Sequence, residues 1–175
     1  MKFIYLLLLA GFTATAQTNV VVNVLTESTF EAIQINGYSL SQIKNIHGEE
    51  SQIVNLFGVP DEKKISTVSG ASYEYYYNEG FEIGFSTLYG GNATLGSFEI
   101  NDSTMIININ GVSFSVGDNI STLSPLNLNE NTGGNYENGV KGFLFAPCSR
   151  CDETVYIHYN TLTQKIIKVG YFEPT

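Results

Sequence analysis

The sequence predicts an α+β protein in which two tandem related units, about residues 30–100 and 105–172, make antiparallel sheet with short helices packed on one face. Three observations predict this class: an internal repeat with Asn-Gly turns, apolar residues that alternate along short segments, and one compact helical pattern. Tyr and Phe are frequent, Pro is scarce and Trp is absent, which favours strands punctuated by turns.

The internal repeat appears when residues 33–47 are placed over residues 107–121, at a shift of 74. Eight of the 15 aligned positions are identical, whereas chance gives about one. Each copy carries an Asn-Gly step between apolar residues, which favours a type I′ turn because both central positions need positive φ. We therefore expect each unit to begin with a hairpin. The identical pairs are Ile33/Ile107, Ile35/Ile109, Asn36/Asn110, Gly37/Gly111, Ser39/Ser113, Ser41/Ser115, Asn45/Asn119 and Ile46/Ile120.

A short helix is predicted after the first hairpin, over residues 50–57. Ile53, Leu56 and the last residue of this segment share one helical face, and Gly58 is placed to end the helix. The second unit offers only residues 119–123 before a proline, which predicts no more than one turn of helix.

Each unit continues with a predicted strand pair and a closing strand, near residues 95–100 and 166–172. Residues 127–142, which precede the strand pair of the second unit, are rich in Asn and Gly and predict a long loop. The alternating positions of the strand pairs are Tyr73, Tyr75, Tyr77, Phe81, Ile83 and Phe85 in the first unit, and Phe143, Phe145, Val155, Ile157 and Tyr159 in the second.

Residues 1–16 have the features of a secretory signal. A positive charge precedes the apolar run 3–12, and a small-x-small cleavage pattern ends at Ala16. This run is about half the length needed to cross a bilayer, and no cysteine lies near the cleavage point. We therefore expect a single exported domain, residues 17–175, that is periplasmic or extracellular and has no transmembrane or lipid anchor.

The formal net charge of −9 disfavours two classes of partner. Nucleic acid phosphates and anionic lipids are repelled by an acidic surface. Nucleic acid is therefore not expected as a partner, and no cofactor is expected.

The pair Cys148 and Cys151 allows three interpretations: a redox centre, half of a zinc site, or a structural disulfide. The carboxylates of Asp152 and Glu153 oppose a thiolate, and zinc would need further ligands such as His158. Export favours oxidised cysteines. The favoured interpretation is a disulfide at a hairpin tip, and a metal site is not expected.

An aromatic strand in the first unit supplies a possible binding surface. Tyr73, Tyr75 and Tyr77 alternate toward the core, which leaves Tyr76 on the opposite face. Glu74 and Glu82 are expected on that same face. Tyr76, Glu74 and Glu82 are therefore the candidate binding residues.

The segment Leu-Phe-Gly-Val-Pro at 56–60, followed by Tyr75 and Tyr77, resembles a family of small bacterial envelope proteins of the β-lactamase-inhibitor-like and SmpA/OmlA type. Those proteins share a short helix ending in Leu-Gly-x-Pro and then aromatic strands. The resemblance covers about half of the chain. It implies a sheet with helices on one face, and a role in binding proteins.

No nucleophile with a base and an orienting acid is recognisable in the sequence. The function predicted is a non-catalytic exported binding module for a protein partner. The alternatives are a thiol-disulfide oxidoreductase that uses the CxxC pair, or an unrecognised hydrolase. The oligomeric state is left open.

Overall fold

The computed structural model describes residues 20–67, 72–77, 80–87, 91–131, 137 and 139–173. The predicted leader lies outside these residues, as does most of the first strand pair's tip and part of the predicted loop 127–142. The fold is α+β: most residues in regular structure are in strands of two sheets, and the helices are few and short.

The larger sheet has eight strands in the order β1-β10-β11-β12-β7-β6-β5-β4. All its neighbouring strands are antiparallel except β1 and β10, which run parallel. The strands are β1 (Asn23–Val24), β4 (Glu62–Ser66), β5 (Ser72–Tyr77), β6 (Phe81–Ser86), β7 (Thr94–Ile100), β10 (Val140–Ala146), β11 (Thr154–Asn160) and β12 (Lys165–Phe172).

The smaller sheet has four strands in the order β3-β2-β8-β9 and is built from the two predicted hairpins. At each turn the Asn and Gly both have positive φ, 49° and 85° in the first hairpin and 49° and 84° in the second, as predicted. The hairpins pair with each other through β2 and β8, a contact that the sequence did not predict. The strands are β2 (Gln34–Ile35), β3 (Tyr38–Ser39), β8 (Ile107–Ile109) and β9 (Val112–Phe114).

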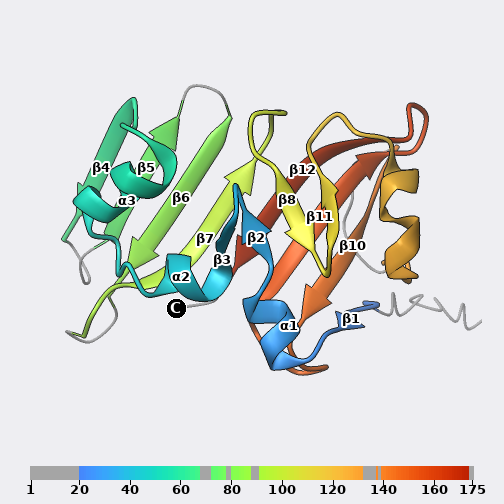
Figure 1. The fold of residues 1–175 in the computed structure, drawn as a ribbon, viewed down its shortest axis with the longest axis horizontal. Coiled ribbons are helices and arrows are strands. Elements are labelled where there is room, and N and C mark those ends of the chain that lie inside the picture. The colour runs from blue at the N-terminus through green and yellow to red at the C-terminus, as the bar shows by residue number, and fades with distance from the viewer. Residues whose placement is uncertain are drawn as a thin grey trace, which may run out of the picture.

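The smaller sheet and the helices lie on one face of the larger sheet (Figure 1). The helix predicted over residues 50–57 is confirmed at both ends, and it stops at Gly58, whose φ is 84°. The helical elements are α1 (Glu27–Glu31), α2 (Leu40–Lys44), α3 (Glu50–Phe57) and the 3₁₀ helix η1 (Ile120–Leu126).

The helical turn of the second half is longer than predicted. We expected it to stop before Pro125, but η1 continues through this proline to Leu126. The reason is that the fixed φ of proline, near −65°, lies within the range of a 3₁₀ helix. The helix then ends at Asn127, which adopts the left-handed conformation.

The predicted alternation of apolar residues is confirmed. On β6 and β11 every second residue is buried, and on β5 the central Tyr75 is fully buried while Tyr73 and Tyr77 are partly buried. The buried side chains form one cluster with residues of the smaller sheet and the helices. The other set of side chains on each strand therefore lies on the opposite, outer face of the larger sheet.

Strands β1, β4 and β10 of the larger sheet differ from the prediction, and β1 lies before the first predicted unit. The predicted loop 127–142 is shorter than expected, because Val140 already belongs to β10. Strand β4 was not predicted at all, because it lies at the edge of the sheet with four of its five residues exposed. An edge strand of this kind has no alternation of apolar and polar residues that could reveal it.

The two halves of the larger sheet meet at β7 and β12. Gly170 faces Glu99 at the centre of this pair, with Val169 facing Ile100 and Tyr171 facing Phe98 on either side. Strands β4 to β6 extend from one side of this junction, and β11 and β10 extend from the other. The outer face is therefore continuous across the junction.

Candidate functional site on the outer face of the large sheet

The three predicted binding residues lie together on the outer face. Tyr76 of β5 faces Glu82 of β6 in the strand register. The Tyr76 hydroxyl donates a hydrogen bond to Oε2 of Glu74 at 2.7 Å. Both glutamates are exposed, and Tyr76 is half-buried.

Tyr76 stands in a strongly negative environment. Its hydrogen bond to Glu74, its partial burial and the nearby charges of Glu74, Glu82 and Glu62 raise its pKa to about 12. In the described part of the chain, no basic side chain forms an ion pair with Glu74 or Glu82. The ammonium of Lys64 lies over the Tyr76 ring, 4.3 Å from its centroid.

Beside Tyr76 the outer face is hollowed into a shallow trough. Three adjoining hollows, of about 340, 420 and 80 Å³, all have Ser97 of β7 in their lining. Gly84 of β6 supplies no side chain beyond its backbone, which leaves space above the sheet. Phe172 of β12, with 53% of its surface exposed, borders two of the hollows. We call this feature the trough, lined by Glu74, Glu82, Gly84, Ser97 and Phe172.

The far side of the trough is closed by a network around Glu99. The Lys168 ammonium lies 2.8 Å from Oε1 of Glu99, and the Tyr156 hydroxyl donates to Oε2 at 3.2 Å. Burial opposes the charge of Glu99, but the hydrogen bonds from Lys168 and Asn101 outweigh it and lower the pKa of Glu99. The Tyr156 ring lies over Gly170, where a Cβ atom would be 2.2 Å from Cζ.

Sequence reasoning found Tyr76, Glu74 and Glu82 but missed Ser97, Phe172 and the network around Glu99. Ser97 and Glu99 lie on β7, next to β6, whereas Phe172 and the partners of Glu99 come from β11 and β12, which only the β7–β12 junction brings close. One signal was available: Phe172 follows the buried Tyr171 in the last strand, so alternation places an aromatic side chain on the outer face.

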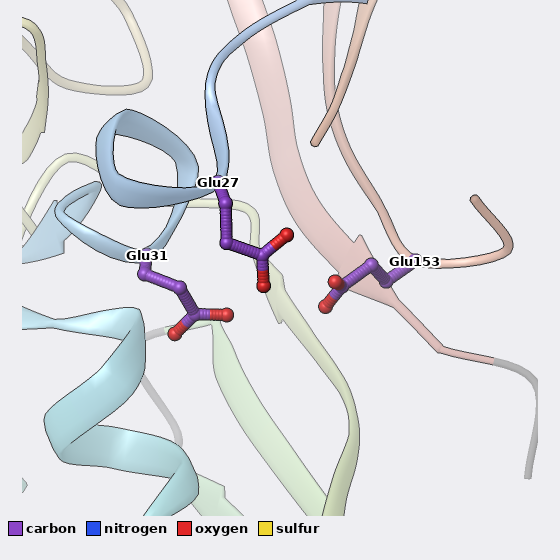
Figure 2. A group of neighbouring side chains, drawn as sticks. All are labelled: Glu27, Glu31 and Glu153. Carbon is purple, nitrogen blue, oxygen red and sulfur yellow. The ribbon is translucent and has the colours of Figure 1, made fainter. Parts of the chain in front are cut away.

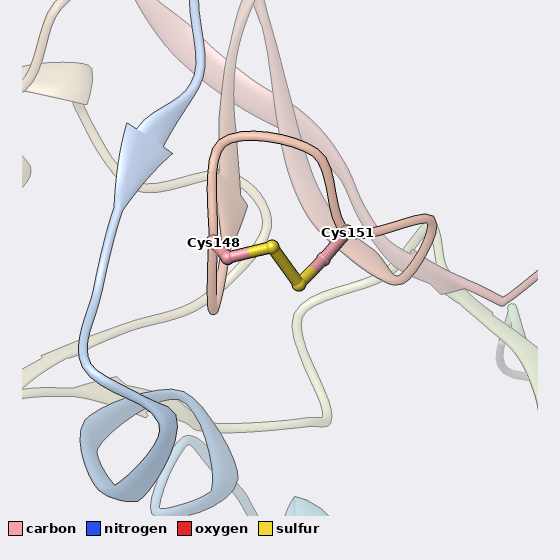
Figure 3. Close-up of a disulfide and its surroundings, with 2 residues drawn as sticks. All are labelled: Cys148 and Cys151. Atoms are coloured by element: carbon pink, nitrogen blue, oxygen red, sulfur yellow. A yellow bond between two sulfur atoms is a disulfide. The ribbon is translucent and has the colours of Figure 1, made fainter.

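Cys148 and Cys151 lie at the tip between β10 and β11, with their sulfur atoms at disulfide distance (Figure 3). A redox CxxC starts a helix, where the dipole favours the thiolate, whereas this pair is in a hairpin tip. His158, considered as a zinc ligand, lies along β11 opposite Gly142 and Lys168. The disulfide therefore closes the tip between β10 and β11.

A second cluster holds the carboxylates of Glu27, Glu31 and Glu153, which point toward one another within 4.8 Å (Figure 2). The Lys44 ammonium lies 2.5 Å from Glu31 and 2.6 Å from Glu153. Burial opposes the charge of Lys44, but its hydrogen bonds to Glu153 and Glu31 outweigh it and raise its pKa. The positive charge among these carboxylates is thus supplied by lysine, and the cluster ties α1 and α2 to the start of β11.

Among the helices that the structure describes, none is long and apolar enough to cross a membrane.

The sequence matches no protein-family model. No curated protein matches it either. Among solved structures, it is similar to an extracellular protein containing a SCP domain from Bacillus anthracis str. Ames, with 11% sequence identity and a TM-score of 0.41. The match covers 72% of this chain and 43% of that chain, so this chain spans less than half of that protein's length.

Proposed function

We propose that this chain is a non-catalytic, exported binding module that holds a protein partner against the trough. One observation carries the proposal: Glu74 and Glu82 stand exposed beside Tyr76, and no described basic side chain forms an ion pair with either, although Lys64 faces Glu74 in the strand register. Exposed carboxylates that form no ion pair within the described chain can form one with a partner's basic group. The adjoining hollows and the exposed Phe172 ring give that partner an apolar contact.

The charge of the chain supports protein over the other large partners. An acidic face repels nucleic acid and anionic membranes. Aromatic residues in a trough with a polar rim are typical of protein interfaces.

The protonation of the Tyr76 hydroxyl and the setting of the disulfide support binding rather than catalysis. With a pKa of about 12, the Tyr76 hydroxyl stays protonated at neutral pH and serves as a hydrogen-bond donor. Catalytic acids and bases are most effective with pKa values near the working pH. The disulfide setting likewise favours a cross-link over thiol exchange.

We further propose that the two halves of the chain descend from one duplicated unit. The smaller sheet pairs Gln34 with Asn108, and these positions are equivalent at the shift of 74 residues. The larger sheet continues outward from β7 and β12 in matching order on both sides. We also propose a relation to the small bacterial envelope proteins of the β-lactamase-inhibitor-like and SmpA/OmlA type, because residues 56–60 carry a similar motif.

The test is site-specific cross-linking in the exported, full chain. A photoreactive benzoylphenylalanine replaces Phe172 in the trough, and the matched control carries it at Leu162, which is 88% exposed in the turn before β12. We expect cross-linking to one protein partner from position 172 alone, and its loss when Glu74→Gln and Glu82→Gln are added. Equal cross-linking from both positions would contradict the proposal.

A further inference from the structure

We infer that Tyr76 and its carboxylates bind a lysine or arginine side chain of the partner, and that Lys64 holds this place in the free protein. The inference rests on the proposed binding function and names the chemistry of the partner's contact. We call the group of Tyr76, Glu62, Glu74 and Glu82 the Tyr76 cation site.

The position of Lys64 shows which kind of group fits the site. Its ammonium lies 4.3 Å from the centroid of the Tyr76 ring, and its ion pair to Glu62 is long, at 3.7 Å. A cation over an aromatic face is attracted by the ring quadrupole. The Lys64 side chain is 56% exposed, so it leaves the ring without breaking a buried contact.

The negative charge of the site exceeds what Lys64 supplies. The charges of Glu62, Glu74 and Glu82 all act on the Tyr76 hydroxyl, and Lys64 is the basic side chain that lies over this ring. The neighbouring Lys63 is engaged elsewhere, because its ammonium lies 2.5 Å from Glu50. The site therefore attracts a partner's cation that can contact these carboxylates in place of Lys64.

The site also suits an extended segment that carries the cation. Glu74 and Glu82 both line the hollows that meet at Ser97, so a chain anchored at Tyr76 continues into the trough toward Phe172. An arginine has a further advantage, because its planar guanidinium stacks on an aromatic ring and donates to carboxylates together.

The other half of the outer face serves as an internal comparison. There Tyr156 and Glu99 also lie together, but Lys168 already neutralises the carboxylate at 2.8 Å. The Tyr156 ring lies over Gly170 and is half-buried. The carboxylate beside Tyr156 therefore already has its cation within the chain.

The test uses a blocked peptide of arginines and one tryptophan, with a matched peptide that has glutamine in place of arginine. The chain contains no tryptophan, so the peptide's fluorescence reports binding alone. The variants are Lys64→Met and the pair Glu74→Gln with Glu82→Gln. Their charge-matched controls are Lys141→Met, at a site paired with Glu130, and Glu27→Gln with Glu49→Gln.

We expect the arginine peptide to bind and the glutamine peptide not to bind. Lys64→Met should tighten Kd about threefold, since it removes the competing cation. The double glutamine variant should weaken Kd about tenfold. In NMR spectra, the Lys64 methylene resonances should lose their ring-current shift as the peptide displaces this side chain.

Equal effects of Lys64→Met and Lys141→Met would overturn the inference, because binding would then follow net charge. An absence of peptide binding, with cross-linking from position 172 intact, would overturn the inference and leave the proposed function standing. A neutral oligosaccharide that shifts Tyr76 resonances while Lys64 stays in place would also overturn it. Loss of both the peptide and the cross-link would refute the proposed function as well.

Discussion

The two halves of the outer face use the same kinds of residue in opposite ways. On β5 and β6, Tyr76 lies beside two carboxylates that form no ion pair with a described basic side chain, and an exposed lysine covers its ring. On β11 and β12, Tyr156 lies over a glycine and its carboxylate partner Glu99 is paired with Lys168. The carboxylates beside Tyr76 thus have no ion-pair partner among the described residues, whereas the carboxylate beside Tyr156 has one within the chain.

The difference depends on two residues on β12. Gly170 gives the Tyr156 ring room to lie down on the sheet, and Lys168 supplies the charge that Glu99 needs. The first half has Gly84 in its hollow, but no aromatic ring lies over it: a Cβ there would meet Ser97 Oγ at 3.4 Å. On the same sheet, the glycine of one half is therefore covered by a tyrosine ring, whereas the glycine of the other half lines the trough.

The largest effect is expected at Gly170. In Gly170→Ala the new methyl group would overlap the Tyr156 ring, so the ring must leave the sheet and lose its contact with Glu99. We expect a loss of about 2–3 kcal/mol in the free energy of unfolding, as for other overpacked sites. Urea denaturation measures it.

The matched control is Gly84→Ala on the open half. There the added methyl group makes close to ordinary contact, and we expect a change within about 0.5 kcal/mol. If Gly170→Ala and Gly84→Ala lowered the free energy of unfolding equally, the packing of the Tyr156 ring on Gly170 would not contribute to stability.

The second-largest loss of stability is expected at the hairpin tip between β10 and β11. Replacing both Cys148 and Cys151 with serine removes a cross-link over a very short loop, which costs about 2 kcal/mol in the chain-entropy model. Partner binding should survive, because the trough is built on other strands. Hydrogen exchange should quicken at the ends of β10 and β11 and not in β5 and β6; a loss of binding in the folded double variant would point to a role for the thiols.

The smallest effect is expected from Lys44→Met, in the network between α2 and the start of β11. The network is partly exposed, so solvent screening limits the cost at pH 7 to about 1 kcal/mol. Adding Glu31→Gln and Glu153→Gln should restore most of it, because neither carboxylate that Lys44 contacted then keeps its charge.

The network also predicts a pH dependence. The pKa of Lys44 is raised in the folded state, because hydrogen bonds to Glu153 and Glu31 outweigh its burial, and burial raises that of Tyr171. A raised pKa adds stability that is fully present below the unfolded values, near 10, and is lost as pH rises through the folded values. Denaturation between pH 8 and 11.5 should show a fall above pH 10 that is shallower in Lys44→Met. Identical slopes would exclude the lysine's contribution.

Local chemistry explains the parts of the fold that were predictable. The Asn-Gly steps, the end of α3 at Gly58 and the alternation along β5, β6 and β11 depend on neighbours in sequence, and all are confirmed. The helices α1 and α2 were missed because each is only five residues long. Such short helices depend on caps and tertiary packing, and they have no full amphipathic pattern.

Half of the candidate site was predictable on the same grounds. Tyr76, Glu74 and Glu82 lie within one strand pair, so alternation alone placed them on the outer face. By itself, therefore, the sequence determined the turns, the strand faces and this cluster, because each is fixed by the conformation of a few consecutive residues. Only the tertiary structure decided that β7 joins β12, which adds Phe172 to the trough and satisfies Glu99 with Lys168. Strand order depends on packing across the whole core, and no short segment of sequence encodes it.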